Sequence, residues 1–261
     1  MKANNEVCVI KALKKGMCHI LVTFDRINLR VNMKLKYLII SFLILTLTYS
    51  CGQKQENVIA IDVLLTLPQD VYNQAVDLNK SVLENNPNNF TLDAQHIPHI
   101  TLIQAYVNES DVPEIEKVLV GLYETIENDT LLVDKLQYNK GKQASFASMG
   151  IEKSEALMRL HEKVIKILEP FSVSNGSQAS YVQNEDGTPI DDFTIAYVPK
   201  FVSDHSYENY NPHISLGVAD TSVLDSLETH HFHPTKFKAP TLALYQLGNY
   251  GTARKLLWES K

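Results

Sequence analysis

Two nearly identical peptides, Pro-His-Ile-Thr-Leu and Pro-His-Ile-Ser-Leu, carry the side chains of this sequence that are best suited to chemistry. Alternate side chains of a β-strand face opposite ways, so His99 shares a face with Thr101, and His213 shares a face with Ser215. The aliphatic residues between them face the other way and can anchor each strand in a core. Each peptide therefore predicts a strand that presents an imidazole and a hydroxyl together.

Two such strands placed together would line a cleft with two histidines and two hydroxyls, a set suited to in-line displacement at phosphorus without a metal. A neutral imidazole can take a proton from an attacking water while an imidazolium protonates the leaving oxygen, and both forms of histidine exist near neutral pH. We therefore expect His99 and His213 to be the catalytic acid–base pair, and Thr101 and Ser215 to bind the non-bridging oxygens of the substrate. Which histidine is the base stays open.

The elements expected around the motifs form two loosely equivalent halves, each with one motif strand. Apolar and β-branched runs predict strands, and apolar residues at helical spacing predict helices. The expected strands are 58–67, 97–107, 131–138, 143–151, 213–218, 241–247 and 253–259. The expected helices follow Pro68, surround Pro113 and cover 154–168 and 222–228. This mixture predicts an α+β fold.

A long polar passage, 172–210, precedes the second motif, and we expect one strand within it, at 193–198. The passage carries several aromatic residues, which are Tyr181, Phe193, Tyr197, Tyr207 and Tyr210. They could belong to a lid whose rings stack on a base. The passage could equally be a surface insertion with its own small hairpin.

The pair of His-x-[Thr/Ser]-Leu motifs resembles the two-histidine (2H) phosphoesterase superfamily, which includes RNA 2′-5′ ligase-like proteins and cyclic phosphodiesterases. The resemblance covers about residues 58–259. It implies a bilobal α+β fold in which two antiparallel sheets face a central cleft, with helices outside and a pseudo-two-fold relation. It also implies hydrolysis of 2′,3′-cyclic phosphates, or formation and cleavage of 2′-5′ linkages, with no metal or other cofactor. By position, His99 and His213 match the acid–base pair, and Thr101 and Ser215 match the phosphate-binding residues.

The segment before the domain has the layout of a secretory signal peptide, with a basic start, an apolar core and a small residue before a cysteine. Its apolar run is shorter than the roughly 20 residues that span a membrane. Cys51 resembles the lipid-acceptor cysteine of a bacterial lipoprotein, although Thr48 stands where such signals most often have Leu. We therefore expect lipidation at Cys51 and attachment to a membrane.

The expected organisation has three parts. An upstream extension and signal peptide cover 1–50, with Met33 as the true start, a lipidated tether covers 51–57, and the 2H-type domain covers 58–261. This organisation places the protein in the cell envelope, anchored by lipid. The alternatives are one long leader, an uncleaved anchor, or a cytoplasmic protein that begins at Met1.

The charge balance limits the substrates. The whole chain has 24 basic and 30 acidic residues, and after removal of 1–50 it retains 16 and 28, a net charge of −12. Long nucleic acids bind to clustered Lys and Arg, so we expect a small nucleotide, a short oligonucleotide or a non-nucleic phosphodiester. No cysteine follows Cys51, which excludes a disulfide or a cysteine nucleophile within the domain.

Three functions are compatible with these features. The first is a metal-independent phosphodiesterase that hydrolyses 2′,3′-cyclic phosphate or 2′-5′ phosphodiester bonds, with RNA 2′-5′ ligase activity as its variant. The second is a non-catalytic nucleotide-binding lipoprotein. The third is a zinc hydrolase that uses His230, His231 and His233, although this stretch is more typical of a solvated turn. The sequence does not determine the oligomeric state.

Overall fold

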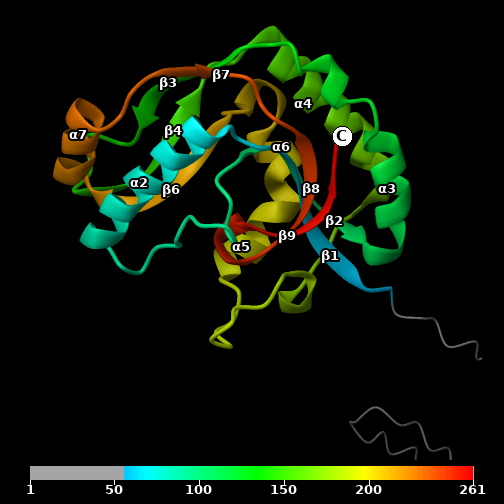
Figure 1. Ribbon diagram of the computed structural model, residues 1–261. Coiled ribbons are helices and arrows are strands. Elements are labelled where there is room, and N and C mark those ends of the chain that lie inside the picture. Colours follow the sequence, from blue (N-terminus) through cyan, green and yellow to red (C-terminus); the bar gives the residue numbers. More distant parts are fainter. Residues whose placement is uncertain (1–55, 261) are drawn as a thin grey trace, which may run out of the picture. The chain divides into compact units, whose positions relative to one another are not determined.

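The computed structural model describes residues 56–260, which form two antiparallel sheets with helices packed around them (Figure 1). The strands are β1 (Val58–Leu65), β2 (Ile100–Asn108), β3 (Leu131–Gln137), β4 (Ala144–Ile151), β5 (Ser172–Val173), β6 (His213–Asp220), β7 (Thr235–Phe237), β8 (Leu242–Leu247) and β9 (Ala253–Glu259). The five-stranded sheet has the order β5-β2-β1-β8-β9, and the four-stranded sheet has the order β6-β4-β3-β7. The expected α+β class with two antiparallel sheets is confirmed.

The two motifs lie in different sheets. The first leads into β2, which is hydrogen-bonded to β1 and β5, and the second begins β6, which lies at the edge of its sheet beside β4. Strands β2 and β6 also contact one another. Two peptides that are far apart in the sequence are thus brought together where the sheets meet.

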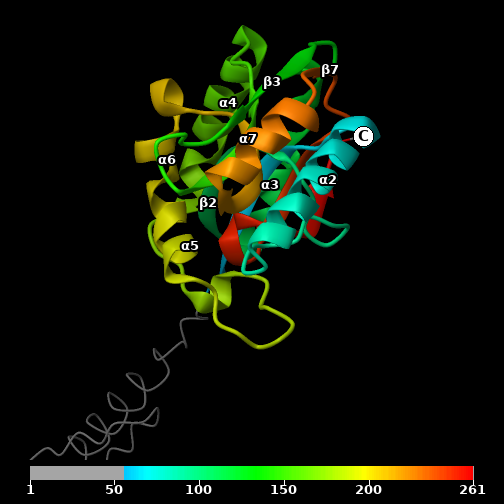
Figure 2. The same cartoon turned by 90° about the vertical axis from the view of Figure 1, so that its left-hand side faces the viewer.

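Helices cover both sheets (Figures 1 and 2). Their bounds are α2 (Gln69–Asn85), α3 (Val112–Leu119), α4 (Glu155–Leu168), α5 (Asp192–Tyr197), α6 (Phe201–His205) and α7 (Thr221–His230). Helix α2 packs on β6 and α7, whereas α4 packs on β2 and α3, and α6 also contacts β2. Each motif strand is therefore supported by a helix.

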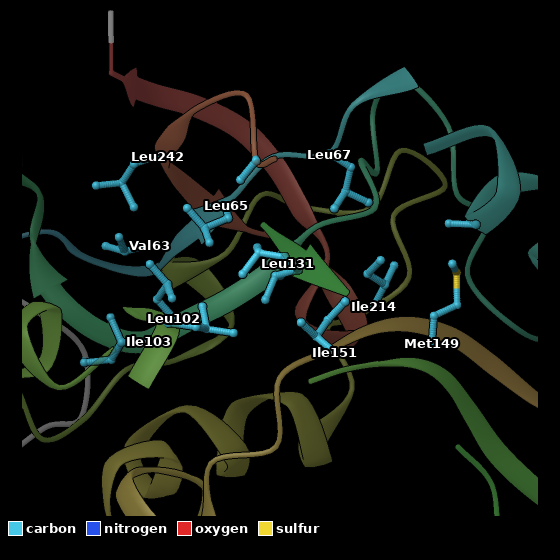
Figure 3. Packing of buried hydrophobic residues seen from close by; sticks show 14 of the residues in the cluster. Val63, Leu65, Leu67, Leu102, Ile103, Leu131, Met149, Ile151, Ile214 and Leu242 are labelled. Atoms are coloured by element: carbon cyan, nitrogen blue, oxygen red, sulfur yellow. The ribbon is translucent and has the colours of Figure 1, made fainter. Parts of the chain in front are cut away.

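The aliphatic residues of both motifs are anchors, as the alternation predicted. Ile100, Leu102, Ile214 and Leu216 are fully buried, and burial of each such side chain contributes about 1.5–3 kcal/mol. Leu102 and Ile214 belong to one buried cluster that draws on both sheets (Figure 3). The two motif strands share one hydrophobic core through these residues. The opposite faces of the strands, which carry the histidines and hydroxyls, are therefore fixed relative to one another.

Two expected elements differ from the structure. Residues 193–198 were expected to form a strand, but the chain there is helix α5, because the Asp191 carboxylate accepts the backbone N–H groups of Phe193 and Thr194 and caps it. Apolar residues at helical spacing extend from Ile115 to Ile126, but the helix around Pro113 ends at Leu119. Gly121 adopts a left-handed φ of 80° just beyond that end.

Candidate functional site

Both motif strands carry the same irregularity. In β2 the pairing with β1 skips Leu102, and in β6 the pairing with β4 skips Leu216, so each motif leucine is the extra residue of a bulge. A β-bulge bends its strand and redirects the neighbouring side chains, and bulges are common next to active sites. The two motifs therefore share a backbone irregularity as well as a sequence.

The two histidines are held in the same way. The Nδ1 atom of His99 lies 2.7 Å from the carbonyl oxygen of Ile97, and Nδ1 of His213 lies 2.7 Å from that of Asn211. A carbonyl can only accept, so each Nδ1 carries the proton. In the neutral form of either ring, Nε2 is then the unprotonated nitrogen. The prolines between each carbonyl and its histidine favour the extended backbone that places the carbonyl there.

A buried carboxylate lies beside the first motif. Asp62, in the middle of β1, is fully buried, and its Oδ2 accepts hydrogen bonds from Thr101 Oγ1 at 2.7 Å and from Gln104 Nε2 at 3.1 Å. The same oxygen lies 3.5 Å from Nε2 of His99. The second motif has no equivalent acidic neighbour among the residues that the structure describes.

This difference separates the two imidazoles electrostatically. Burial lowers the pKa of His99, but the contact with Asp62 and its negative charge, together with the Ile97 carbonyl, outweigh burial and raise the pKa above its ordinary value. Burial lowers the pKa of His213, and the positive charges of His99 and His205 lower it further, while the Asn211 carbonyl offsets only part of the shift. Near neutral pH, the protonated form is therefore favoured more at His99 than at His213, and the neutral form is favoured more at His213.

The four residues predicted for the site line one cavity of about 740 Å³, together with Gln104, Gly217 and Thr252. The structure thus brings His99, Thr101, His213 and Ser215 to one place. The volume lies within the range of small-molecule sites.

The two hydroxyls are not equivalent. The single proton of Thr101 is donated to Asp62, so this hydroxyl offers lone pairs to the cavity unless it rotates. The side chain of Ser215 makes no hydrogen bond within residues 56–260 and is partly exposed in the cavity. The expectation that both hydroxyls donate to a phosphate therefore fits Ser215 better than Thr101.

Aromatic side chains surround the opening of the cavity. Phe146, Phe193 and Tyr250 line it and have exposed fractions of 47%, 74% and 53%. The ring of Phe146 lies edge-on to His213, with 6.3 Å between centroids. Phe193 belongs to the passage 172–210, so that passage contributes to the cavity wall.

Tyr250 is held in a strained backbone conformation. It has a φ of 57°, which is uncommon for a residue other than glycine. Its backbone N–H donates to the hydroxyl of Thr194 in α5 at 3.0 Å. The inserted helix thus supports a turn between β8 and β9 that carries an aromatic ring into the cavity.

No lysine or arginine is present among the described residues that line this cavity, and Asp191 is the one acidic residue in the lining. Phosphate binding in proteins ordinarily uses Arg or Lys. The cationic charge available to an anion at this site is therefore that of the imidazoles.

The sequence reasoning missed Asp62, Gln104 and Tyr250. For Asp62 a signal exists, because a single carboxylate interrupts the otherwise apolar strand Val58–Leu65. The pairing of Asp62 with Gln104 across β1 and β2 depends on the register of the sheet. The contribution of Tyr250 depends on the packing of α5, which the sequence did not predict.

The other histidines of residues 56–260 do not form a cluster suited to a metal ion. Within residues 56–260, no group of three or more His, Cys, Asp and Glu side chains is arranged to hold a metal ion. His230 ends α7, and His231 and His233 are exposed beyond it. His161 in α4 is fully buried and stacks on Tyr210, with 3.7 Å between the ring centroids.

The predicted lipidation site, Cys51, lies outside the described residues, as do the predicted start at Met33 and the expected signal peptide. Across residues 56–260, none of the helices has the length and apolar character needed to span a membrane.

The chain matches no protein-family model and no curated protein. Among solved structures, it is similar to TT0787 of Thermus thermophilus, with 15% identity, a TM-score of 0.45, and coverage of 77% of this chain and 96% of that one. It is similar to E. coli LigT in the apo form, with 12% identity, a TM-score of 0.42, and coverage of 78% and 99%. It is also similar to E. coli LigT complexed with 3′-AMP, with 12% identity, a TM-score of 0.41, and coverage of 78% and 96%. Residues 56–260 have the two antiparallel sheets that the resemblance implied.

Proposed function

We propose that the protein is a phosphodiesterase that hydrolyses 2′,3′-cyclic phosphate or 2′-5′ phosphodiester bonds by acid–base catalysis at His99 and His213, without a metal. One observation carries this proposal. Both imidazoles line one cavity, and in both Nδ1 is tied to a backbone carbonyl, which leaves Nε2 to act on a substrate.

The proposed reaction uses the different environments of the two rings. Neutral His213 takes a proton from water as the water oxygen attacks phosphorus. The bond from phosphorus to one ribose oxygen breaks, and the His99 imidazolium gives its Nε2 proton to that oxygen. Donors such as the Ser215 hydroxyl stabilise the charge on the non-bridging oxygens. The two histidines end in exchanged protonation states, which proton transfer with solvent restores.

The substrate that fits this cavity is a small nucleotide with one negative charge. An imidazolium can donate a hydrogen bond to the singly charged phosphate of a cyclic diester, but the lining provides no Lys or Arg for additional phosphates. The aromatic rings at the opening, including Phe193, can stack on a base, and such stacking is worth about 1–3 kcal/mol per base. Long RNA is disfavoured by the same absence of clustered basic residues.

The test is hydrolysis of 2′,3′-cyclic mononucleotides by the purified full-length chain in the presence of EDTA. A matched substrate carries an additional 5′-phosphate. We expect turnover that EDTA does not affect, and a kcat/KM for the 5′-phosphorylated substrate at least about tenfold lower, because its extra charge has no cationic partner. Loss of activity with EDTA would contradict the metal-free mechanism.

The alternatives predict other results. A non-catalytic nucleotide-binding protein would bind the cyclic mononucleotide without consuming it. RNA 2′-5′ ligase activity would join RNA ends that carry a 2′,3′-cyclic phosphate and a 5′-hydroxyl.

Attachment of the protein to the cell envelope through lipid on Cys51 is a further proposal that rests on the sequence pattern alone. Mass spectrometry of the amino terminus of the native protein tests it. A diacylglyceryl-modified Cys51 is the expected result, and an intact chain that begins at Met1 would contradict it.

A further inference from the structure

Asp62 occupies an unusual position for a carboxylate. It lies in the middle of β1 with no exposed surface, and its neighbours along the strand are buried apolar residues. Removal of an ionised carboxylate from water costs several kcal/mol unless hydrogen bonds and an opposite charge offset that cost. The contacts of Asp62 therefore indicate what the residue does.

Two neutral donors and one imidazole surround this carboxylate. Thr101 and Gln104 donate to Oδ2, whereas Oδ1 is buried without a hydrogen-bond partner in the described part of the chain. No Lys or Arg within residues 56–260 forms an ion pair with Asp62, and the one such contact comes from Nε2 of His99, at 3.5 Å. His99, when protonated, is thus the group that can balance the negative charge of Asp62.

We propose that Asp62 is a positioning residue that holds His99 as the imidazolium in the free protein, and thereby makes His99 the acid and His213 the base. This inference rests on the proposed function for its catalytic meaning. The state of His99 itself can be measured without any substrate.

The geometry leaves the proton of His99 available for the reaction. The separation of 3.5 Å between Asp62 Oδ2 and His99 Nε2 exceeds the 2.7–3.2 Å of a normal N–H···O hydrogen bond. Asp62 raises the pKa of His99 through this long contact with Nε2 and through its negative charge, while the Ile97 carbonyl fixes the ring through Nδ1. The Nε2 proton can pass to the leaving oxygen when that oxygen approaches closely.

The other titratable groups around this pair come from the 192–210 passage and β6. Burial and the charge of Asp62 raise the pKa of Tyr197 to about 12 and raise that of Tyr210 further, so both phenols stay neutral. His213 from β6 interacts electrostatically with His99, and His205 interacts electrostatically with His213. Their charges oppose protonation of the neighbouring imidazoles. Asp62 is therefore the group that favours the cationic form of His99.

The test is a pH titration of the histidines by NMR, on the full chain labelled with ¹³C at histidine Cε1. His99→Gln and His213→Gln identify the two signals. In the wild type, we expect His99 to titrate above the ordinary midpoint of about 6.5 and His213 below it. In Asp62→Asn, which keeps the shape but removes the charge, the midpoint of His99 is expected to fall below 6.5. A wild-type His99 that titrates at or below 6.5, or a midpoint that Asp62→Asn leaves unchanged, would overturn the proposal.

Thr101→Val is the matched control, because it removes one neutral hydrogen bond from Asp62 but keeps the charge. We expect His99 to retain its high midpoint in this variant, and loss of that midpoint would contradict a role for the charge. If Asp62→Asn does not fold, the proposal is still tested by the titration midpoints of the wild type and of Thr101→Val. A low His99 midpoint in either protein would contradict it.

Kinetics provide the second measurement. In Asp62→Asn, the alkaline decrease in kcat/KM for a 2′,3′-cyclic mononucleotide is expected to begin at a lower pH than in the wild type. At neutral pH, kcat/KM is expected to be roughly tenfold lower, mainly because kcat is lower. An unchanged pH profile would contradict the inference. If the wild type hydrolyses no cyclic phosphate, the proposed function fails, while the NMR titration still decides whether Asp62 protonates His99.

Discussion

His99 and His213 make the same hydrogen bond, in which Nδ1–H donates over 2.7 Å to the carbonyl oxygen two residues earlier in the chain. Their backbones are equivalent, since each leads into a strand with a bulge at the motif leucine. Their surroundings are not equivalent, because only His99 has a buried carboxylate at 3.5 Å among the described residues. The symmetry of the backbone positions two imidazoles, and the asymmetry of their neighbours gives them different proton affinities.

The first prediction concerns pH. The reaction needs neutral His213, whose pKa is lowered, and protonated His99, whose pKa is raised. The value of kcat/KM should therefore rise as pH increases through the pKa of His213, stay high around neutral pH, and fall as pH passes the pKa of His99. Initial rates at subsaturating substrate across pH 4–10 give this profile. A single optimum at acid pH would contradict the assignment of roles.

The second prediction separates the two hydroxyls. Ser215→Ala removes a donor that is free to bind the substrate, and we expect kcat/KM to fall about 10- to 100-fold with an unchanged pH profile. Thr101→Val removes a hydroxyl whose proton is donated to Asp62. Its loss in kcat/KM is expected to be smaller. Equal losses in the two variants would show that Thr101 also donates directly to the phosphate.

The third prediction concerns the aromatic opening of the cavity. Phe193 is 74% exposed and lines the cavity, so Phe193→Ala removes a stacking surface while leaving the core intact. We expect KM for a cyclic mononucleotide to rise about 5- to 50-fold, with little change in kcat. Val120→Ala, at an exposed apolar residue outside the cavity, is the control and should behave like the wild type. No change in KM for Phe193→Ala would argue against base stacking at this ring.

The fourth prediction concerns stability. His161 is buried and accepts a hydrogen bond at Nε2 from the Tyr207 N–H, while its Nδ1–H donates to the Leu102 carbonyl. Burial lowers its pKa, so the unfolded chain takes up a proton first, and the free energy of unfolding should decrease as pH falls below about 6.5.

Urea unfolding between pH 5 and pH 8 measures this effect. In His161→Phe, which retains a ring but leaves the two backbone groups without partners, we expect a loss of about 1–3 kcal/mol for each group and a weaker dependence on pH. His233→Gln, at an exposed histidine, is the control. If His161→Phe keeps the pH dependence of the wild type, the effect has another origin.

The periodic apolar runs predicted most of the strands and helices, and the paired peptides predicted four residues that line one cavity. Alternation along each strand predicts which side chains anchor and which face the cavity, and the buried state of Ile100 and Leu216 agrees with it. A repeated motif is informative because two copies must satisfy the same geometry. This is why His99 and His213 could be placed together without a structure.

Other features depend on long-range contacts that no local pattern encodes. The residues 193–198 have the composition of a strand, but the Asp191 cap and the packing of α5 against the Asn249–Gly251 turn make them helical. The ion pair of Asp62 with His99 requires the register of β1 against β2. For these reasons, the sequence predicted the two imidazoles that line the cavity but not the carboxylate that distinguishes them.

The most direct test of the central claim compares hydrolysis of a 2′,3′-cyclic mononucleotide by the wild type, His99→Ala, His213→Ala and the double variant, all full length and in EDTA. If the two imidazoles act as one acid–base unit, each single variant should lose about 10²- to 10⁴-fold in kcat, and the double variant should lose little more. Circular dichroism confirms that each variant is folded. Either single variant with the wild-type rate would contradict two-histidine catalysis at this site.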